Sequence, residues 1–290
     1  MKVRSRIAPA SSMVTALFVA VAGCAPGDET PEDVEVQTGA VSVYPRATGS
    51  DIQYGTMYTW PRNGLNNVPV LAGANNACFL NSVWGKFHIA NDIPDEVDVA
   101  LLADGTWVIG GQATGDGTPS GDAFCIRNVA PTALVAAKTG ESKPMGVDAA
   151  THSCFLTSIG GGFDSAGSYA RVRKSGSQWL LEVSGGTFKR ATAQCVPIVA
   201  GAQRSVSAPG GEVQLLGTEN DSGIIEEAIN TSSKAPYFCA LTNVQGILVG
   251  PDQNWVGTYL KPQADGTFAW KLGRGTFSTF PVSASARCLR

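Results

Sequence analysis

One eight-residue stretch occurs three times in the chain, and it restricts the possible folds more than any other feature. The copies are residues 78–85, 154–161 and 239–246, and all three fit the pattern Cys-x-Leu-[Asn/Thr]-[Ser/Asn]-[Val/Ile]-x-Gly. Apolar and polar residues alternate in this pattern, which is the period of a strand with one buried face. We therefore predict that each copy starts with the same β-strand, and we call the three regions copies 1, 2 and 3.

The same order of shorter elements follows each of these strands. In copy 1 the sequence predicts a hairpin of strands 97–102 and 106–109 around an Asp-Gly turn, and then a fourth strand at 123–126. The corresponding strands are expected at 169–173, 178–183 and 193–196 in copy 2, and at 256–260, 267–272 and 285–289 in copy 3. A strand-like leader precedes each copy, at 56–60, 133–137 and 212–216. The high glycine content (34 residues) and the few charged residues (16%) favour short strands and turns, and only residues 223–229 suggest a helix.

Six cysteines other than Cys24 are divided evenly among the copies. An even number of cysteines in an exported chain is typical of disulfides, although six cysteines allow many pairings. The repeat favours one bridge in each copy: Cys78–Cys125, Cys154–Cys195 and Cys239–Cys288. Each bridge would close a loop of about 40–50 residues and stabilise the fold by about 4 kcal/mol. A metal site is the rival interpretation, but the sequence has no Cys-x-x-Cys pair.

The bridges require the fourth strand of each copy to lie beside the first, because a disulfide holds its two Cα atoms within about 4.4–6.8 Å. Each copy is therefore expected to form a small barrel or sandwich, with a third-strand tryptophan packed against the bridge (Trp107, Trp179 and Trp270). The predicted fold is all-β, with three tandem disulfide-stapled antiparallel repeats of about 70–80 residues. We place these repeats at 41–130, 131–203 and 204–290. A single body with pseudo-threefold symmetry, similar to a β-trefoil, is the alternative.

The N-terminus has the features of an export signal. Lys2, Arg4 and Arg6 supply positive charge, and an apolar segment at 13–21 that is too short to span a bilayer follows them. The segment ends in Val21-Ala22-Gly23-Cys24, which resembles the lipobox of bacterial lipoproteins. This resemblance covers residues 1–24 only. It implies cleavage of the signal peptide, residues 1–23, and attachment of diacylglycerol to Cys24, with acyl chains such as palmitate.

The residues that follow the cysteine extend this expectation. In lipoproteins of Gram-negative bacteria, a residue other than Asp at the next position, here Ala25, implies sorting to the outer membrane. Residues 24–40 are acidic, contain proline and hold few large apolar side chains, so they are expected to form a disordered tether. Ordinary secretory cleavage, which would leave Cys24 as a free thiol, is the alternative.

The charge and hydropathy of the mature chain restrict its partners. Residues 1–23 contain three of the 21 basic residues and none of the 24 acidic ones, so the mature chain has a net charge of 18 − 24 = −6. An acidic chain is poorly suited to phosphate backbones, and we expect no nucleic acid partner. Since no other apolar run of the sequence reaches transmembrane length, membrane attachment would depend on the lipid at Cys24 alone.

The sequence lacks the usual motifs of enzymes. Its two histidines are His88 and His152, and neither is expected to act as a catalytic base, since the cysteine near His152 belongs to a predicted bridge. Neither Gly-x-Ser-x-Gly nor His-Glu-x-x-His occurs. A threefold repeat also argues against catalysis, because an enzyme normally has one active site. We therefore predict a protein that is not an enzyme and that has no cofactor.

An acidic insertion distinguishes copy 1 from the other copies. It contains Asp92, Asp95, Glu96 and Asp98, whose oxygens are the ligands that Ca²⁺ prefers, although their spacing differs from that of known calcium loops. A solvated charged loop is the alternative. A hydrolase acting on envelope polysaccharide would need two placed carboxylates, and Asp92, Asp95 and Glu96 are its candidates.

Binding sites commonly lie on loops that a rigid scaffold positions. The loops after the three first strands, at 88–97, 164–168 and 248–255, differ in length and charge. The candidate binding residues near them are Trp84, Trp255, Asp92, Asp95 and Glu96. The sequence thus predicts a membrane-anchored bacterial surface lipoprotein that binds a glycan, an envelope component or a protein partner. A structural component of the envelope or of an appendage, and the carboxylate-dependent hydrolase, are the alternatives.

Overall fold

The structure is a computed structural model, and it describes most of the chain after residue 66. The described residues are 53–54, 58–60, 67–73, 75–90, 93–114, 117–127, 129–198, 212–215, 223–230, 238–248, 254–262, 268–276 and 281–289. All of them belong to one of the two units into which the chain divides, Gln37–Arg290. The predicted signal peptide, the lipid attachment at Cys24 and the tether at 24–40 lie outside the described residues.

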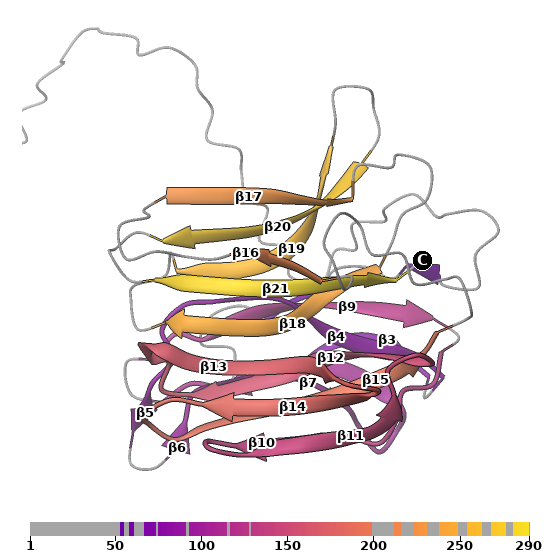
Figure 1. Cartoon of the computed structure of the whole chain (residues 1–290), viewed down its shortest axis with the longest axis horizontal. Coiled ribbons are helices and arrows are strands. Elements are labelled where there is room, and N and C mark those ends of the chain that lie inside the picture. The colour runs from indigo at the N-terminus through magenta and orange to yellow at the C-terminus, as the bar shows by residue number, and fades with distance from the viewer. Residues whose placement is uncertain are drawn as a thin grey trace, which may run out of the picture. The chain divides into compact units, whose positions relative to one another are not determined.

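Every helix or strand among the described residues is a β-strand, which confirms the predicted all-β class (Figure 1). Copy 1 contains β1 (Gln53–Tyr54), β2 (Tyr58–Trp60), β3 (Val68–Ala72), β4 (Ala77–Trp84), β5 (Ile89–Ala90), β6 (Ile93–Pro94), β7 (Glu96–Leu101), β8 (Thr106–Gln112) and β9 (Ser120–Arg127). Copy 2 contains β10 (Val135–Lys138), β11 (Ser142–Asp148), β12 (His152–Gly161), β13 (Asp164–Ser175), β14 (Gln178–Ser184) and β15 (Lys189–Pro197). Copy 3 contains β16 (Glu212–Leu215), β17 (Gly223–Asn230), β18 (Phe238–Ile247), β19 (Trp255–Pro262), β20 (Phe268–Thr276) and β21 (Val282–Leu289).

The prediction of a helix at 223–229 is wrong, because this segment is strand β17. It pairs antiparallel with β20, from Gly223 opposite Thr276 to Asn230 opposite Trp270. Its isoleucines are β-branched and favour extended backbone. The edge of β20 also offers hydrogen-bond partners along the whole segment, whereas an isolated helix of this length is only marginally stable.

Disulfides join the first and fourth strands of each copy, as predicted. The bridges are Cys78–Cys125, Cys154–Cys195 and Cys239–Cys288, with Cα atoms 4.0, 3.9 and 4.1 Å apart. The two cysteines of each bridge are directly opposite each other in the strand pairs β4–β9, β12–β15 and β18–β21. Each bridge therefore closes a loop that contains the whole hairpin of its copy.

The polar residue after the leucine of each motif forms a β-bulge. The register of the pair shifts between Leu80 and Ser82 in copy 1, and at the matching place in copies 2 and 3. The extra residue is Asn81, Thr157 or Thr242, and all three are buried. Asn81 accepts a hydrogen bond from the Thr258 hydroxyl at 2.5 Å. A short polar side chain suits this position because a bulge leaves backbone groups without ladder partners.

Each copy is divided between two sheets. Its first and fourth strands form one half, its second and third strands form the other, and a leader strand lies beside each half. The strand orders of the three large sheets are β1-β9-β4-β19-β20-β17, with β2 also paired to β9; β10-β15-β12-β7-β8-β3; and β11-β14-β13-β18-β21-β16. Every large sheet therefore combines a half of one copy with a half of another.

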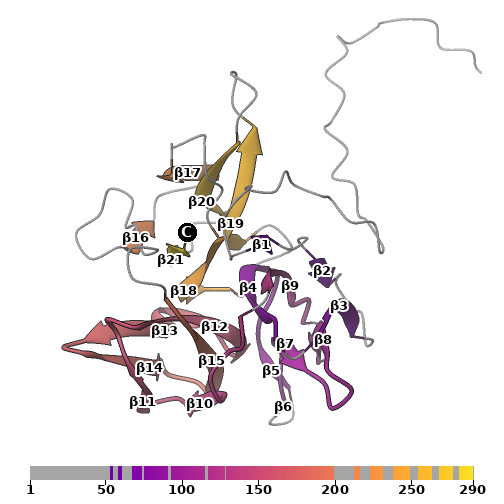
Figure 2. The same ribbon diagram turned by 90° about the vertical axis from the view of Figure 1, so that its right-hand side faces the viewer.

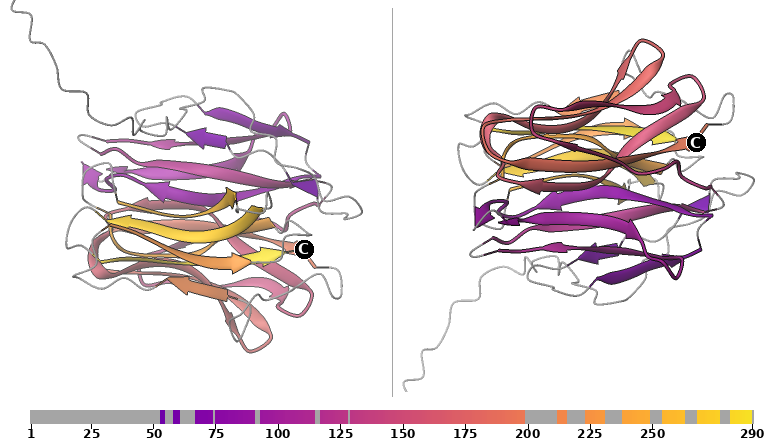
Figure 3. Two further views of the ribbon diagram at one scale, coloured as in Figure 1. Left: turned by 90° about the horizontal axis from the view of Figure 1, so that it is seen from above. Right: turned by 90° about the horizontal axis from the view of Figure 1, so that it is seen from below.

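The two halves of a sheet meet where the first strand of one copy pairs with the second strand of another, and we call these junctions seams. The seams are β7–β12, β13–β18 and β4–β19. The β4–β19 seam returns from copy 3 to copy 1, with Trp255 opposite Trp84, so the copies close into a ring. Figure 2 shows three groups of strands around β4, β12 and β18. In Figure 3 the yellow strands of copy 3 lie beside the purple strands of copy 1.

The expectation of self-contained tandem units needs correction. The two halves of a copy do pack on each other, and in copy 2 the Trp179 indole nitrogen donates to the His152 carbonyl at 2.8 Å, next to the bridge. The edge strands of these halves are nevertheless paired across copies, because an open edge would leave a row of backbone donors and acceptors without partners. The three copies are joined sheet to sheet, and the exact repeat boundaries at 41–130, 131–203 and 204–290 stay predictions.

Three phenylalanines, one from each copy, meet where the first strands converge. The ring centroids of Phe79 and Phe155 are 4.9 Å apart, and Phe238 lies 5.7 and 5.4 Å from them. All three side chains are fully buried. Phe238 precedes its cysteine, whereas Phe79 and Phe155 follow theirs, but residues two apart share one side of a strand. The third copy thus supplies its ring from a position that departs from the motif.

The glycine that ends each motif is required by the backbone. Gly85, Gly161 and Gly246 have φ angles of 95°, 104° and 112°. A Cβ atom on these residues would lie 1.9, 2.2 and 2.1 Å from the carbonyl oxygens of Thr118, Phe188 and Pro281 respectively. Only glycine tolerates both the left-handed conformation and this contact.

Candidate functional site

Each seam presents two rows of residues on the side of its sheet that faces away from the buried Val83, Ile159 and Val244. Residues directly opposite in paired strands project to the same side of a sheet. At the β4–β19 seam one row is Asp122, Ser82 and Gly257, and the other is Ser120, Trp84 and Trp255. At the β7–β12 seam one row is Thr192, Ser158 and Asp98, and the other is Arg190, Gly160 and Glu96. At the β13–β18 seam one row is Ser285, Asn243 and Arg171, and the other is Ser283, Gln245 and Tyr169. Equivalent positions therefore carry different chemistry at the three seams.

The β7–β12 seam is charged. Glu96 of β7 and Arg190 of β15 form an ion pair, although the strand β12 runs between them. The pair can cross β12 because the residue between them is Gly160, and a Cβ on Gly160 would lie 3.1 Å from the Glu96 Cβ. Asp98 lies on the same side of β7 as Glu96, directly opposite Ser158. Two carboxylates and one guanidinium thus share this face.

Both carboxyl groups at this seam are harder to ionise than usual. Burial first, and then the neighbouring Glu96 charge, raise the pKa of Asp98 to about 6, although Arg190 opposes the shift. Burial also raises the pKa of Glu96, which the charge and hydrogen bond of Arg190 oppose. One guanidinium does not fully compensate two partly buried carboxylates, so this face is electrostatically unfavourable at neutral pH.

We expect the substitution Asp98→Asn to stabilise the protein at pH 7.5 by about 1–3 kcal/mol. The folded pKa of Asp98 is raised above its ordinary value, so the folded state holds the proton more tightly and stability falls as pH rises from about 4 to about 6. An asparagine removes this loss. Denaturant unfolding at pH 4 and pH 7.5 measures it, with the exposed turn variant Asp104→Asn as control. Equal effects of Asp98→Asn at the two pH values would contradict the raised pKa.

Asp95 and His88, next to this seam, have a structural role. The Asp95 carboxylate is fully buried, and it accepts hydrogen bonds from the backbone and ring nitrogens of His88 at 2.9 and 2.7 Å. Its other oxygen accepts from the Thr114 amide and hydroxyl at 2.5 and 2.8 Å. Both oxygens are thus occupied by protein donors, so the prediction of Asp95 as a ligand-contacting residue is not supported by its position.

The calcium prediction for the acidic insertion can be examined only in part. Asp92 lies outside the described residues. Asp95 is committed to the loop network, while Glu96 and Asp98 lie on the seam. Within the part of the chain that the structure describes, no group of three or more His, Cys, Asp or Glu side chains is placed to hold a metal ion.

The β13–β18 seam carries a second charged group. Glu182 of β14 lies opposite Arg171 and forms ion pairs with Arg171 and Arg173 at 2.8 and 2.7 Å. Hydrogen bonds from these two guanidinium groups, that of Arg173 first, lower the pKa of Glu182 to about 2. Arg171 also lies 4.4 Å from the centre of the Tyr169 ring. This face has an excess of positive charge, and its carboxylate stays ionised at neutral pH.

The β4–β19 seam is aromatic and nearly uncharged. Trp84 and Trp255 come from copies 1 and 3, and the strand pairing places them directly opposite each other. Both are partly exposed, whereas Trp107, Trp179 and Trp270 are at most 2% exposed in the core. This seam therefore brings together the two tryptophans that the sequence singled out as binding candidates.

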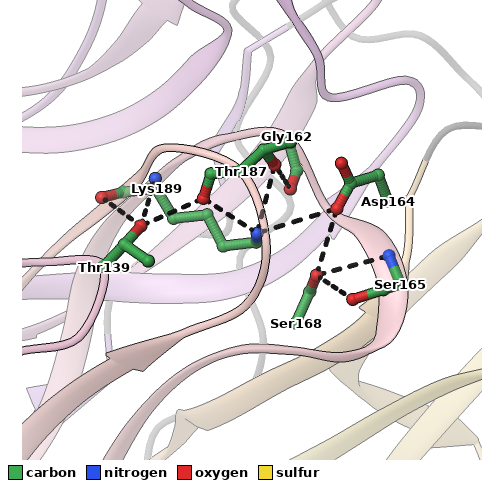
Figure 4. A network of polar contacts seen from close by, with 7 residues as sticks. All are labelled: Thr139, Gly162, Asp164, Ser165, Ser168, Thr187 and Lys189. Carbon is green, nitrogen blue, oxygen red and sulfur yellow. Dashed lines mark hydrogen bonds and ion pairs between the residues drawn. The ribbon is translucent and has the colours of Figure 1, made fainter.

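A lysine is buried beside the loop between β12 and β13 (Figure 4). Lys189 is fully buried, and its ammonium nitrogen donates to the Thr187 carbonyl and hydroxyl at 3.2 and 3.3 Å. It also lies 3.8 Å from Asp164, whose charge opposes the lowering of the lysine pKa by burial. Asp164 in turn accepts from the Ser168 hydroxyl at 3.4 Å. The network holds the ends of three strands together, as the Asp95 network does in copy 1.

The predicted loop at 164–168 is part of strand β13, because that strand extends back to Asp164 to pair with Ile247 of β18. Sequence reasoning missed Asp98, Arg190, Arg171 and Glu182 as members of the seam faces. These residues lie far apart in the sequence. The one available signal was that residues two apart in a predicted strand project to the same face of the sheet.

Comparison of the chain with protein-family models, with curated proteins and with solved structures gives no match. Among the residues described here there is no helix whose length and hydropathy would suit a bilayer span.

Proposed function

We propose that this chain is a membrane-anchored lipoprotein of the bacterial surface, and that it binds a glycan, another envelope component or a protein partner without catalysing a reaction. The three seams share one backbone pairing and one kind of buried interior, yet they present an aromatic face, an acidic face and a basic face. A common scaffold with divergent, partly exposed faces is what supports a binding function. The lipid at Cys24 and the outer-membrane location are part of the same proposal.

The anchor is tested by fatty-acid labelling of the whole chain in a Gram-negative host. We expect label on the wild type and none on Cys24→Ser. Label that persists on Cys24→Ser would refute attachment at this residue. Secretion of the unlabelled wild type into the medium would refute the anchor altogether.

Binding is tested with the whole chain and one variant for each seam, Trp84→Ala, Glu96→Gln and Arg173→Gln. We expect the protein to bind isolated outer membranes, and one of the three variants to weaken this binding by about tenfold, which corresponds to about 1.4 kcal/mol. The other two variants serve as controls that keep the same fold. If all three variants bind as tightly as the wild type, the seams are not the binding surface and the proposal fails.

A carboxylate-dependent hydrolase is the second candidate, because Glu96 and Asp98 share a face and both have raised pKa values. One could then act as acid and the other as base. Release of reducing ends from envelope polysaccharide, abolished in both Glu96→Gln and Asp98→Asn, would establish it. Release that persists in both variants would exclude these carboxylates.

A further inference from the structure

The aromatic seam combines features that fit one class of ligand. A sugar ring has a flat face of C–H groups and an edge of hydroxyls, so its binding site needs an apolar platform with hydrogen-bonding groups beside it. The β4–β19 seam offers Trp84 and Trp255 in one row, and Ser82 and Asp122 in the next. The matching rows of the β7–β12 and β13–β18 seams contain no tryptophan.

Two glycines leave room for the side chains of this seam. Gly275 lies directly opposite Trp255 in β20, and a Cβ atom on it would be 2.1 and 2.5 Å from the Nε1 and Cδ1 atoms of that tryptophan. The Trp255 indole therefore lies across the sheet in the space that a side chain at 275 would fill. Gly257 brings β4 and β19 close together, since its Cβ would lie 2.2 Å from the Ser82 Cβ. Trp255 is partly exposed, so part of its indole remains accessible to a ligand.

Polar groups lie beside the platform on the same side of the sheet. The Asp122 carboxylate is partly exposed and accepts a hydrogen bond from the Ser82 hydroxyl. Ser120 lies directly opposite Trp84 and is fully buried, yet its hydroxyl has no hydrogen-bond partner among the described residues. A buried hydroxyl without a partner costs about 1–3 kcal/mol, so Ser120 destabilises this part of the fold, and the partly exposed Asp122 is the polar group that a ligand can reach.

We infer that the β4–β19 seam binds a neutral sugar ring of a glycan, stacked on Trp84 and Trp255 and hydrogen-bonded through its hydroxyls to Asp122. This inference rests on the proposed function, in which the seams bind a ligand. The ligand is neutral because the eight residues of the two rows, extended to Gly273 and Gly275, contain one carboxylate and no basic side chain. Such a face repels the carboxylates of uronic acids.

The inference is tested with the whole chain by isothermal titration, using gluco-, manno- and galacto-oligosaccharides as neutral probes and polygalacturonate as the anionic comparison. We expect binding of at least one neutral probe and none of polygalacturonate. Trp84→Ala and Trp255→Ala should weaken this binding at least tenfold, while Trp84→Phe, which keeps a ring, should weaken it less. Phe188→Ala, an exposed aromatic outside this seam, is the matched control.

Two further variants keep the test decisive if the tryptophan variants do not fold. Asp122→Asn removes the charged acceptor proposed to hold the sugar hydroxyls, so it should weaken sugar binding. Gly275→Ala should weaken binding by displacing the Trp255 indole without removing any group that contacts the sugar. Ser120→Ala removes a buried hydroxyl that no ligand reaches, so it should leave sugar binding unchanged and serves as the matched control. A merely structural role for Asp122 would change stability and leave sugar binding unchanged.

Absence of binding to every neutral probe at millimolar concentration, or equal binding by wild type, Trp84→Ala and Asp122→Asn, would overturn the inference. The proposed function would still stand if outer-membrane binding depended on the β7–β12 or the β13–β18 seam. Loss of both the sugar binding and the seam dependence of membrane binding would overturn both proposals.

Discussion

Replacing Gly161 by alanine is expected to lower the free energy of unfolding by about 3–5 kcal/mol. Gly161 has a φ angle of 104°, where an L side chain is strained. The added Cβ would also lie 2.2 Å from the Phe188 carbonyl oxygen and 2.7 Å from the Lys189 Cα. Both neighbours are backbone atoms at the start of β15, so relief would require separating the paired strands β12 and β15.

Gly176→Ala separates the two causes of this loss. Gly176 also has a positive φ angle, 62°, but a Cβ there would meet nothing within 4 Å. Its substitution should cost only the conformational strain, about 1–2 kcal/mol. Urea unfolding of the two variants and the wild type makes the comparison. A loss for Gly161→Ala that is no greater than that for Gly176→Ala would show that the close approach to Phe188 does not matter.

Phe155→Ala is expected to have an effect of similar size, about 3–5 kcal/mol, because it opens a cavity where all three copies meet. The Phe155 ring contacts both Phe79 and Phe238, and none of the three is exposed. The surrounding strands are held by disulfides and cannot collapse into the space. We expect a lower thermal midpoint with the transition of the whole Gln37–Arg290 unit staying single.

The control for this variant is Phe188→Ala, which removes the same ring from an exposed position and should change stability by less than about 0.5 kcal/mol. If the copies were independent beads, Phe155→Ala would instead split the transition, with one part destabilised and two parts unchanged. Calorimetry of the whole chain distinguishes these outcomes.

The bridges and most strands could be predicted because the bridges follow from how the cysteines repeat, and the strands follow from local residue patterns. Cysteine spacing that repeats with the strand pattern favours one bridge in each copy, and that pairing is the one observed. The alternation of apolar and polar residues marks strands by a period that no helix shares. The segment 223–229 was predicted wrongly because its isoleucines fit one face of a short helix as well as a strand.

The candidate site was predictable only in fragments. Trp84 and Trp255 stood out as aromatic residues near loops, but their pairing depends on copy 3 returning to copy 1, which no local signal encodes. Asp95 and Glu96 are neighbours in sequence but make different contacts: Asp95 belongs to the buried loop network, and Glu96 pairs with Arg190 on the seam. Asp95 lies in the loop just before β7 and Glu96 is the first residue of β7, so adjacency in the sequence gives them no shared role.

The sequence by itself determined the all-β class and favoured the three bridges, because strand patterns are local and cysteines pair in twos. Tertiary structure alone decided that the sheets are shared between copies, that Phe238 replaces the missing ring at Ala240, and which side chains face each other across the seams. The physical reason is that an exposed strand edge forms the same backbone hydrogen bonds with any partner strand of matching register. Which partner it takes is set by how the halves of all three copies pack around the buried phenylalanines.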